Sequence, residues 1–313
     1  MRKAAVRAYM SSANLGPGFD ILAVALNAFY DTVEIKLVGE GSTRIDLSVR
    51  GKYVEKIPHG EGNVVIGPIM RALEVTGEKL QLEVNLEKGV PPGKGLGSSG
   101  ASSAAAAKAI NELLGGVFSE DELIYIAGEG ERIASGEPHY DNVSASLLGG
   151  FVMVNPGEKI SARRISSGTD FEFLLVIPEI TTPEKKTGLA RSVLPKQILL
   201  RDYVKNSSNL AKLIYGIVSG NLKMAGEGME DHIVETARAS AGLIPLYMDV
   251  KKRAKELGAY GVSVSGAGPS ILLLAKRELH RRIGEEISKL YAERGYKVSI
   301  VSAEPAPQAY EIR

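Results

Sequence analysis

A dense glycine-rich segment, set between an alternating strand and an alanine-rich stretch, constrains this chain more than any other feature. Residues 91–100 read Pro-Pro-Gly-Lys-Gly-Leu-Gly-Ser-Ser-Gly and run directly into alanines and serines at 101–107. Glycine lets backbone N–H groups turn inward and approach an anion, and a helix N-terminus adds unpaired donors and partial positive charge. The segment therefore predicts a phosphate site, with a nucleotide as the expected ligand.

Two widespread glycine motifs do not fit this segment. Gly95, Gly97 and Gly100 match the pattern GxGxxG. The dinucleotide fold, however, needs a second strand that ends in an acidic residue about 20 positions further on. The acidic residues at that distance stand at the start of a predicted helix instead. A Walker A loop needs Ser or Thr after Gly-Lys, and here Gly95 follows Lys94. A bare turn is the simplest alternative, but one glycine would serve it.

Composition narrows the class of protein. The 313 residues are 44% hydrophobic and 24% charged, with a net charge of +1, so no overall field favours nucleic acid or an anionic membrane. The absence of cysteine removes disulfides, thiolate nucleophiles and sulfur-ligated metals. No window is apolar enough to span a bilayer, and the first residues do not resemble a signal peptide. We expect a soluble cytoplasmic enzyme without a nucleic-acid or membrane partner.

Hydrophobic periodicity predicts a mixed α+β chain. Strands are expected at 30–38, 44–49, 80–86, 149–154, 171–177, 261–265, 271–275 and 297–301. Helices are expected at 63–75, from the glycine-rich segment to 114, from a capping box at Ser119 and Glu122 to 134, and at 202–218, 246–257 and 278–294. A polar, glycine-bearing stretch at 155–169 suggests two domains, a nucleotide-binding one at 1–160 and one at 161–313 that contributes to the substrate site.

Three ordered motifs resemble those of the GHMP kinases, the superfamily of galactokinase and the homoserine, mevalonate and phosphomevalonate kinases. Pro91–Ser99 is similar to the nucleotide motif, and Ser263–Ser270 (SVSGAGPS) resembles the third, C-terminal glycine motif. Ser12–Asp20 (SANLGPGFD) resembles the N-terminal signature of homoserine kinases, and His139–Val143 (HYDNV) followed by Gly149–Phe151 is also similar to them. The motifs span nearly the whole chain.

The resemblance implies an N-terminal domain like ribosomal protein S5 and a ferredoxin-like C-terminal domain, with ATP in the cleft between them and a homodimer as the assembly. In the superfamily, the second serine of the motif and a glutamate on the following helix hold Mg²⁺, which points to Ser99 and Glu131. Further nucleotide-binding residues are expected in and around the loop: Asn63, Lys88, Pro91, Gly93, Lys94, Gly95, Leu96, Gly97, Ser98 and Gly100. Gly100 stands where alanine is common, which costs the helix up to ~1 kcal/mol without removing a phosphate donor.

The acceptor site follows from the chemistry of homoserine, a zwitterion with a terminal hydroxyl. Its ammonium needs a carboxylate, and its carboxylate is best held by guanidinium groups. The resemblance offers Asp20 for the ammonium and Arg191 and Arg238 for the carboxylate. Other substrate contacts are expected from Asn14, His139, Asn142, Thr187 and Gly266. Taken singly, each residue also has an ordinary explanation as a turn, cap or surface ion pair.

The catalytic base is the open question. Several members of the superfamily use an aspartate, whereas homoserine kinases have an asparagine, and here Asp141 and Asn142 are adjacent. We interpret Asn142 as the residue that orients the hydroxyl and Asp141 as its support, so that catalysis depends on alignment, Mg²⁺ and the helix dipole. The predicted function is an ATP-dependent homoserine kinase that makes O-phospho-L-homoserine for threonine biosynthesis. The alternatives are a GHMP kinase for mevalonate or a sugar, and a non-catalytic sensor.

Overall fold

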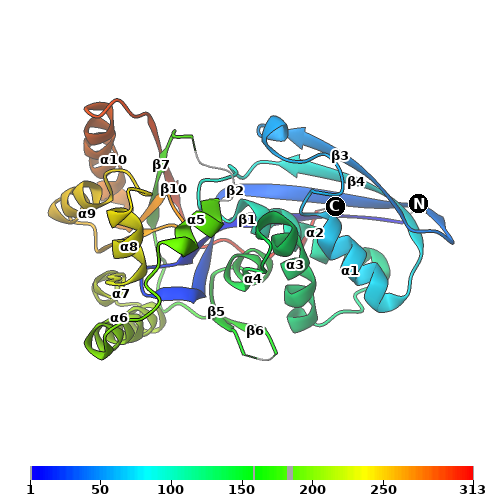
Figure 1. Cartoon of the computed structure of the whole chain (residues 1–313), viewed down its shortest axis with the longest axis horizontal. Helices are drawn as coiled ribbons and strands as arrows, with labels where there is room; N and C mark the ends of the chain where they lie inside the picture. Colours follow the sequence, from blue (N-terminus) through cyan, green and yellow to red (C-terminus); the bar gives the residue numbers. More distant parts are fainter. Residues whose placement is uncertain (1, 158, 182–185, 313) are drawn as a thin grey trace.

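Two separate β-sheets organise the molecule along its long axis (Figure 1). The computed structural model describes residues 2–157, 159–181 and 186–312, and the side chains of residues 186 and 187 lie outside this description. The larger sheet has the order β11-β1-β2-β4-β3, and β5 and β6 extend it from the first half of β2. Its strands are β1 (Lys3–Asn14), β2 (Gly18–Glu40), β3 (Arg44–Gly51), β4 (Leu80–Lys88), β5 (Phe151–Asn155), β6 (Ser161–Ile165) and β11 (Tyr310–Glu311).

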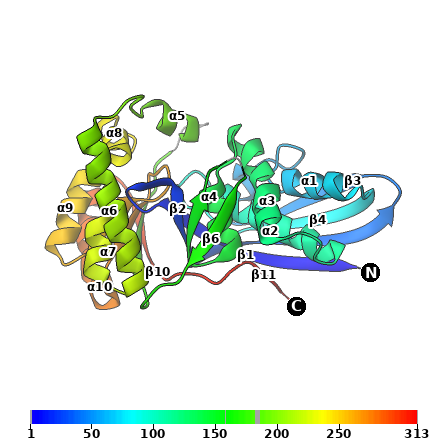
Figure 2. The ribbon, with the colours of Figure 1, turned by 90° about the horizontal axis from the view of Figure 1, so that it is seen from below.

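Four helices cover one face of the larger sheet (Figure 2). They are α1 (Ile66–Thr76), α2 (Ser98–Leu114), α3 (Glu120–Ser135) and α4 (Tyr140–Leu148), and a short 3-10 helix, η1 (Val54–Lys56), precedes α1. The alanines of α2 at 104–107 are fully buried. Their small side chains let the sheet and the neighbouring helices approach α2 closely, as a densely packed interior requires. This packing fixes the glycine-rich loop that precedes α2.

The smaller sheet is antiparallel, with the order β10-β7-β9-β8, and helices cover both of its faces. Its strands are β7 (Phe173–Pro178), β8 (Gly261–Val264), β9 (Ile271–Leu274) and β10 (Val298–Ala303). Helices α9 (Tyr247–Glu256) and α10 (Arg277–Ala292) pack on one face, and α6 (Leu200–Ser219) and α7 (Leu222–Gly228) on the other. Burial on both faces explains why β7 and β9 are continuous apolar runs.

One apolar cluster joins the two sheets. The Phe151 ring, from β5, lies with its centroid 5.0 Å from that of Phe171, just before β7. Met10 of β1 and Leu213 of α6 belong to the same cluster. The short helices α5 (Lys186–Ser192) and α8 (Val234–Ser240) lie near this junction, beside the turn between β1 and β2 (Figure 1). The junction therefore brings residues from both ends of the chain to one place.

The structure contains the expected strands and helices and adds several that the periodicity did not indicate. The additions are β1, the first half of β2, β6, β11, α4, α5, α7 and α8. β1 escapes notice because its buried side chains are mostly alanine and serine, which give a weak alternation signal. β6 lies within the stretch expected to separate two domains, and it pairs with β5 in the larger sheet. No helix among the described residues is long and apolar enough to cross a membrane.

Candidate active site

The glycine-rich loop leaves the N-terminus of α2 without a side-chain cap. Gly93, Gly95 and Gly97 all have positive φ (72°, 76° and 60°), and Gly97 is the N-cap of α2. Helix α3, by contrast, begins with the expected capping box, in which Ser119 and Glu122 satisfy each other's backbone N–H groups. Because no side chain in the described ranges caps α2, the N–H groups of its first turn can bind an anion.

The third glycine motif packs directly against this loop. A Cβ added at Gly95 would lie 2.3 Å from the Ser265 carbonyl oxygen and 2.5 Å from that of Gly268. The Ser265 hydroxyl donates to the Gly95 carbonyl oxygen at 2.7 Å. The next N–H, that of Gly266, donates to the Ala13 carbonyl oxygen at 3.1 Å, near the end of β1. The motif thus connects the phosphate-binding loop to the segment expected to bind the acceptor.

The sequence had led us to expect Lys88 on the open side of the loop, but Lys88 does not face that side. Its ammonium donates to the Asp31 carboxylate, to the Ser98 carbonyl oxygen (2.6 Å) and to the Ser102 hydroxyl (2.8 Å). These contacts use all three N–H donors of a lysine. Burial lowers the pKa of Lys88, and the charge of Asp31 raises it back in part. The alternation of β4 turns Lys88 inward, so it supports the loop from beneath instead of contacting a phosphate.

Two other residues expected at the nucleotide are also held by protein atoms. The Lys94 ammonium donates to two backbone carbonyls at and just after the end of β7, at 2.9 and 2.7 Å, which leaves one N–H for a phosphate. Burial lowers the pKa of Lys94. Asn63 is buried; it donates to the Pro58 carbonyl oxygen (2.6 Å) and accepts from the Val65 N–H (3.1 Å). Its amide shapes the entry into α1.

Glu131 has a buried carboxylate oxygen that lacks a partner among the described residues. The residue is 4% exposed, its Oε1 accepts no hydrogen bond there, and its Oε2 lies 3.5 Å from Nδ1 of His139. A buried carboxylate is costly unless it is paired or binds a cation. The orphaned oxygen is therefore an independent sign that a cation belongs at this position.

Ser99 and the helix that carries Glu131 lie on neighbouring surfaces. A Cβ added at Gly130 would be 2.1 Å from the hydroxyl oxygen of Ser103, which lies one turn after Ser99 in α2. The half-buried Ser99 hydroxyl makes no hydrogen bond within the described part of the chain. A hydroxyl and a carboxylate suit Mg²⁺, which is usually held by one or two protein oxygens together with phosphates and water. These residues fit the ion that the resemblance implies.

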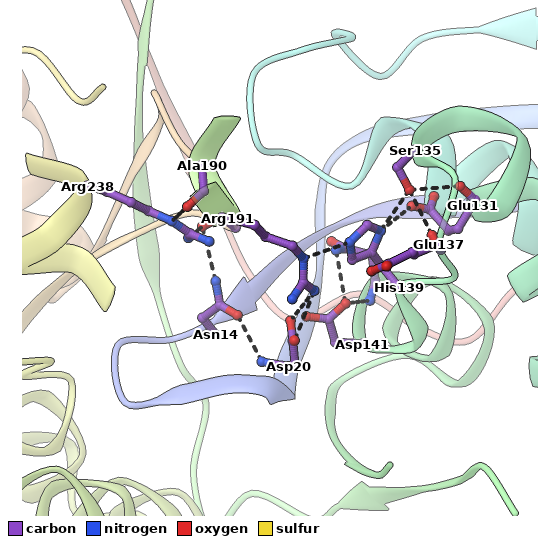
Figure 3. Close-up of polar contacts among 12 residues, drawn as sticks. Asn14, Asp20, Glu131, Ser135, Glu137, His139, Asp141, Ala190, Arg191 and Arg238 are labelled. Atoms are coloured by element: carbon purple, nitrogen blue, oxygen red, sulfur yellow. Dashed lines mark hydrogen bonds and ion pairs between the residues drawn. The ribbon is translucent and has the colours of Figure 1, made fainter. Parts of the chain in front are cut away.

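The residues expected at the acceptor converge in Figure 3, although they come from four segments of the chain. Arg191 of α5 donates from Nη2 to both oxygens of Asp20, at 3.0 and 2.9 Å, and from Nε to Nε2 of His139 at 3.4 Å. The Asp20 N–H donates to Oδ1 of Asn14 at 3.2 Å, and Nδ2 of Asn14 donates to the Gly266 carbonyl oxygen at 3.0 Å. The carboxylate and one guanidinium group of the predicted acceptor site thus face each other.

Arg238 connects the same cluster to the third glycine motif. The residue is buried; Nη1 donates to the Gly266 carbonyl oxygen (2.9 Å) and Nε to that of Ala190 (3.2 Å), directly before Arg191. Its Cζ lies 5.5 Å from the centroid of the Phe19 ring, and that of Arg191 lies 5.3 Å from it. Two guanidinium groups therefore share one aromatic ring. Burial, assisted by the charge of Arg191, lowers the pKa of Arg238.

Glu235 anchors the helix that carries Arg238 and gives the fold a specific pH dependence. Its buried carboxyl accepts from the Val264 N–H at 2.7 Å and from the Tyr247 hydroxyl. Burial raises the pKa of Glu235 from 4.5 to about 8. Between these values the unfolded chain has released a proton that the folded protein keeps, so this group's contribution to stability declines as pH rises through that window.

Glu235→Gln is expected to raise Tm by about 5 °C at pH 8.5 and to have little effect at pH 5. Glutamine keeps the acceptor for the Val264 N–H and cannot ionise. Thermal unfolding from pH 5 to 9 checks this expectation, with the exposed Glu61→Gln as the control. A difference in Tm that does not change with pH would show that Glu235 is not the titrating group.

Asp141 and Asn142 begin α4 beside this cluster. Oδ1 of Asp141 accepts from the backbone N–H of Asn142 (2.8 Å) and from its Nδ2 (3.2 Å). Burial, with the charge of Asp20, raises the pKa of Asp141 to about 6. Burial lowers the pKa of His139, but Glu131 and Asp141 outweigh it, so that the pKa is raised overall. Asp141 is buried and accepts from its neighbour through Oδ1, whereas the half-buried Asn142 is partly open to solvent.

The structure brings the predicted acceptor residues together and connects them to the loop through Gly266. Thr187 belongs to α5, and its side chain lies outside the described part of the structure. Sequence reasoning did not single out Phe19, Ser11 or Ser265 as functional residues. Phe19 lies inside the N-terminal motif, and Ser11 directly precedes it. Their positions in or next to the recognised motifs were the sequence feature that could have indicated a role for them.

Comparison with known proteins shows the superfamily to which this chain belongs. The model of the N-terminal domain of GHMP kinases matches residues 63–150, and that of their C-terminal domain matches residues 213–293. The fold also resembles a mevalonate kinase from L. major solved with R-mevalonate, with a TM-score of 0.67 at 15% identity, covering 98% of this chain and 96% of that one. These matches establish the GHMP kinase fold and confirm the predicted two-part α+β architecture.

Relatives of higher sequence identity show the family within this superfamily. The chain is 41% identical over 309 residues to the homoserine kinase of Aeropyrum pernix, covering 98% of this chain and 97% of that one. It is 41% identical over 304 residues to the homoserine kinase of Thermoplasma volcanium, covering 96% and 94%. The crystal structure of homoserine kinase from Cytophaga hutchinsonii matches with a TM-score of 0.90 at 33% identity, covering 100% and 98%. The chain belongs to the homoserine kinase family of the GHMP kinases.

Proposed function

We propose that this enzyme transfers the γ-phosphate of ATP to the hydroxyl of L-homoserine and releases ADP and O-phospho-L-homoserine. The observation that carries the proposal is the Asp20–Arg191 pair, in which both carboxylate oxygens lie within 3.0 Å of one guanidinium nitrogen. A carboxylate and a guanidinium placed side by side match the ammonium and carboxylate of an α-amino acid. Mevalonate offers no ammonium, and a sugar offers neither charge.

Acceptor binding then proceeds by exchange of ion pairs. Without substrate, Asp20 and Arg191 pair with each other; with it, Asp20 takes the ammonium while Arg191 and Arg238 take the carboxylate. The side chains of Asp20 and Arg191 are 38% and 34% exposed, so solvent screens their pair and its rupture costs about 1 kcal/mol or less. Arg238, already fixed by Gly266 and Ala190, supplies a preorganised cation.

The nucleotide is bound by the loop and the N-terminus of α2. We assign the triphosphate to the backbone N–H groups of residues 95–99, and we assign Mg²⁺ to Ser99 and Glu131. When bound, the cation neutralises charge on the phosphates. We also assign Pro91, Gly93, Lys94 and Gly100, which flank these residues, to the nucleotide site, with Leu96 contributing only its backbone because its side chain is buried. Adenine contact by Asn63 stays a proposal, now restricted by the two bonds its amide already makes.

Asn142 orients the acceptor hydroxyl, and no separate catalytic base is required. Asp141 lies behind Asn142 and holds it by two hydrogen bonds. Phosphoryl transfer depends mainly on positioning and charge neutralisation, so alignment can supply most of the rate. The hydroxyl proton leaves on an oxygen of the transferred phosphoryl group.

The experiment that tests the function is ADP release by the purified protein with Mg-ATP and a panel of acceptors: L-homoserine, L-threonine, L-serine, mevalonate and galactose. Turnover restricted to homoserine supports the proposal. Turnover with mevalonate or galactose keeps the kinase and overturns the acceptor assignment. ATP binding without turnover on any acceptor would favour the non-catalytic sensor.

Arg191→Ala is expected to raise the KM for homoserine by about 10- to 100-fold, because a hydrogen bond to a charged group is worth about 1.5–3 kcal/mol. The KM for ATP is expected to stay within about twofold, since Arg191 contacts Asp20 and His139 and not the loop. Steady-state kinetics with each substrate varied in turn measures both values. Arg281→Ala, at a side chain that is 90% exposed, is the control. An unchanged KM for homoserine would remove Arg191 from the acceptor site.

We also propose that the enzyme is a cytoplasmic homodimer with domains at 1–160 and 161–313, of which the second range contributes two short strands, β6 and β11, to the larger sheet. Large apolar side chains are exposed at the start of α6, among them Leu200 (76%), Val204 (58%) and Tyr203 (55%), and such clusters commonly mark protein interfaces. Light scattering combined with size-exclusion chromatography tests the dimer. Leu200→Glu should shift it toward the monomer if this surface forms the interface.

A further inference from the structure

Ser11 of β1 links the phosphate-binding loop to the beginning of α4. The residue is fully buried, and its N–H donates to the Leu96 carbonyl oxygen at 3.3 Å. Its hydroxyl oxygen lies 3.0 Å from Oδ1 of Asn142, to which it donates, and 3.3 Å from the backbone carbonyl oxygen of the same residue. Ser146, one turn further along α4, donates to the Ser11 oxygen at 3.5 Å. One serine therefore touches both the nucleotide side and the acceptor side of the site.

The Asn142 amide has two side-chain partners, one at its oxygen and one at its nitrogen. Ser11 donates to Oδ1, and Oδ1 of Asp141 accepts from Nδ2 at 3.2 Å. An amide rotated by 180° would place its oxygen against the Asp141 carboxylate, so the contact with Asp141 favours this orientation, and in it the Ser11 hydroxyl donates to Oδ1. The half-buried Asn142 keeps one lone pair on Oδ1 and one N–H for a ligand. Asp141 thus selects the orientation of the amide assigned to the reacting hydroxyl, and Ser11 holds its Oδ1 in place.

Two glycines of the loop make room for this contact. A Cβ at Gly97 would lie 2.1 Å from the Ser11 hydroxyl oxygen and 2.9 Å from Oδ1 of Asn142. A Cβ at Gly100 would lie 3.0 Å from Cβ of Asn142. The loop therefore serves two purposes, because the backbone that approaches a phosphate also leaves space for the Ser11–Asn142 hydrogen bond. The glycine at position 100, which costs the helix some stability, has a local reason here.

We propose that Ser11 is a positioning residue for phosphoryl transfer, which holds the Asn142 amide so that Oδ1 accepts a hydrogen bond from the acceptor hydroxyl beside the loop. This inference rests on the proposed homoserine kinase activity. In the transfer, the acceptor oxygen bonds to Pγ as the bond from Pγ to the bridging oxygen of ADP breaks, and the hydroxyl proton leaves on a γ-phosphate oxygen. Ser11 forms no bond to substrate; it acts through Asn142.

The first experiment compares Ser11→Ala with Ser144→Ala. Ser144 lies in α4 two residues after Asn142, and its fully buried hydroxyl has no partner among the described residues, which makes it a matched control. Ser11→Ala is expected to lower kcat with homoserine by about 10- to 100-fold, as misplaced reacting groups do, with the KM for ATP within about twofold. Ser144→Ala is expected to keep the kcat of the wild type. Equal kcat in all three proteins would overturn the proposal.

A double-mutant cycle separates this role from a merely structural one. In an Asn142→Ala background, Ser11→Ala should cause no further loss of kcat, because the residue through which it acts is gone. Equal losses in both backgrounds would mean that Ser11 acts elsewhere, for instance through Leu96. If Ser11→Ala does not fold, Ser11→Cys keeps the volume and a weak donor, and the same cycle applies to it. Wild-type turnover is measured first, so absent activity on homoserine counts against the proposed function and not against Ser11.

Discussion

Glu131→Gln is expected to lower kcat by roughly 100- to 1000-fold, since a metal ion's stabilisation of transferring phosphate is worth several kcal/mol and each tenfold change corresponds to about 1.36 kcal/mol. The glutamine has the same shape but lacks the charge that we assign to Mg²⁺. The effect of the substitution on stability without Mg²⁺ is expected to differ from its effect on kcat. Oε1 of Glu131 is buried and lacks a partner among the described residues, whereas Oε2 faces His139, so removing the charge relieves one cost and loses one contact, and Tm is expected to change little.

Three measurements check this prediction: kcat against Mg²⁺ concentration, binding of Mg-ATP by calorimetry, and Tm with and without Mg²⁺. Glu129→Gln is the matched control, because Glu129 lies in the same helix and, among the described residues, its side chain pairs only with Arg132 (3.1 Å). The control is expected to retain wild-type kcat and its dependence on Mg²⁺. A Glu131→Gln enzyme that turns over at the wild-type rate would place the cation elsewhere.

The backbone of the glycine-rich loop and of the helix after it was predictable because its determinants are local. A strand, three glycines with positive φ and a helix follow one another without a break, and each has its own sequence signal. The α3 capping box was likewise readable from Ser119 and Glu122 alone. Motifs of this kind depend on backbone geometry within about ten residues, which composition and spacing describe well.

The residues that we propose for the acceptor site meet through contacts between distant parts of the chain, which spacing along the sequence cannot indicate. Asp20 and Arg191 lie 171 positions apart, and Asn14 meets Gly266 across 252. Only the family resemblance indicated that such residues belong to one site, and only the structure shows that they are in contact. Lys88 illustrates the opposite error, because a lysine near a glycine loop suggests a phosphate contact until the pleat of β4 is seen to turn it inward. Burial of a charge against a distant partner has no local signature.

Lys88→Met is expected to reduce the free energy of unfolding by about 3–5 kcal/mol, the usual cost of removing one member of a buried ion pair. The side chains of Lys88 and Asp31 are 3% and 0% exposed, so the remaining carboxylate cannot turn to water. Asp31 also accepts from the N–H groups of Gly89 and Val90 at 2.9 Å each, which hold it in place without its counter-ion. Equilibrium urea unfolding at pH 7 measures the change.

The Lys36–Glu83 pair provides the control for burial. It joins the same two strands, β2 and β4, at 3.0 Å, but its side chains are 33% and 48% exposed. Lys36→Met is therefore expected to cost about 0–1 kcal/mol. A similar loss for Lys88→Met and Lys36→Met would mean that burial does not set the strength of the inner pair.

The double variant Lys88→Met/Asp31→Asn separates the cost of an unpaired charge from the loss of the contact itself. Asparagine can still accept from the two backbone N–H groups, and no net charge then remains beneath the loop. The double variant should regain at least half of the free energy of unfolding that Lys88→Met loses, because most of the penalty comes from the unpaired carboxylate of Asp31. A double variant as unstable as Lys88→Met would instead assign the loss to the missing hydrogen bonds at Ser98 and Ser102, which fix the first turns of α2. Activity then distinguishes the two causes, since only a displaced first turn would raise the KM for ATP.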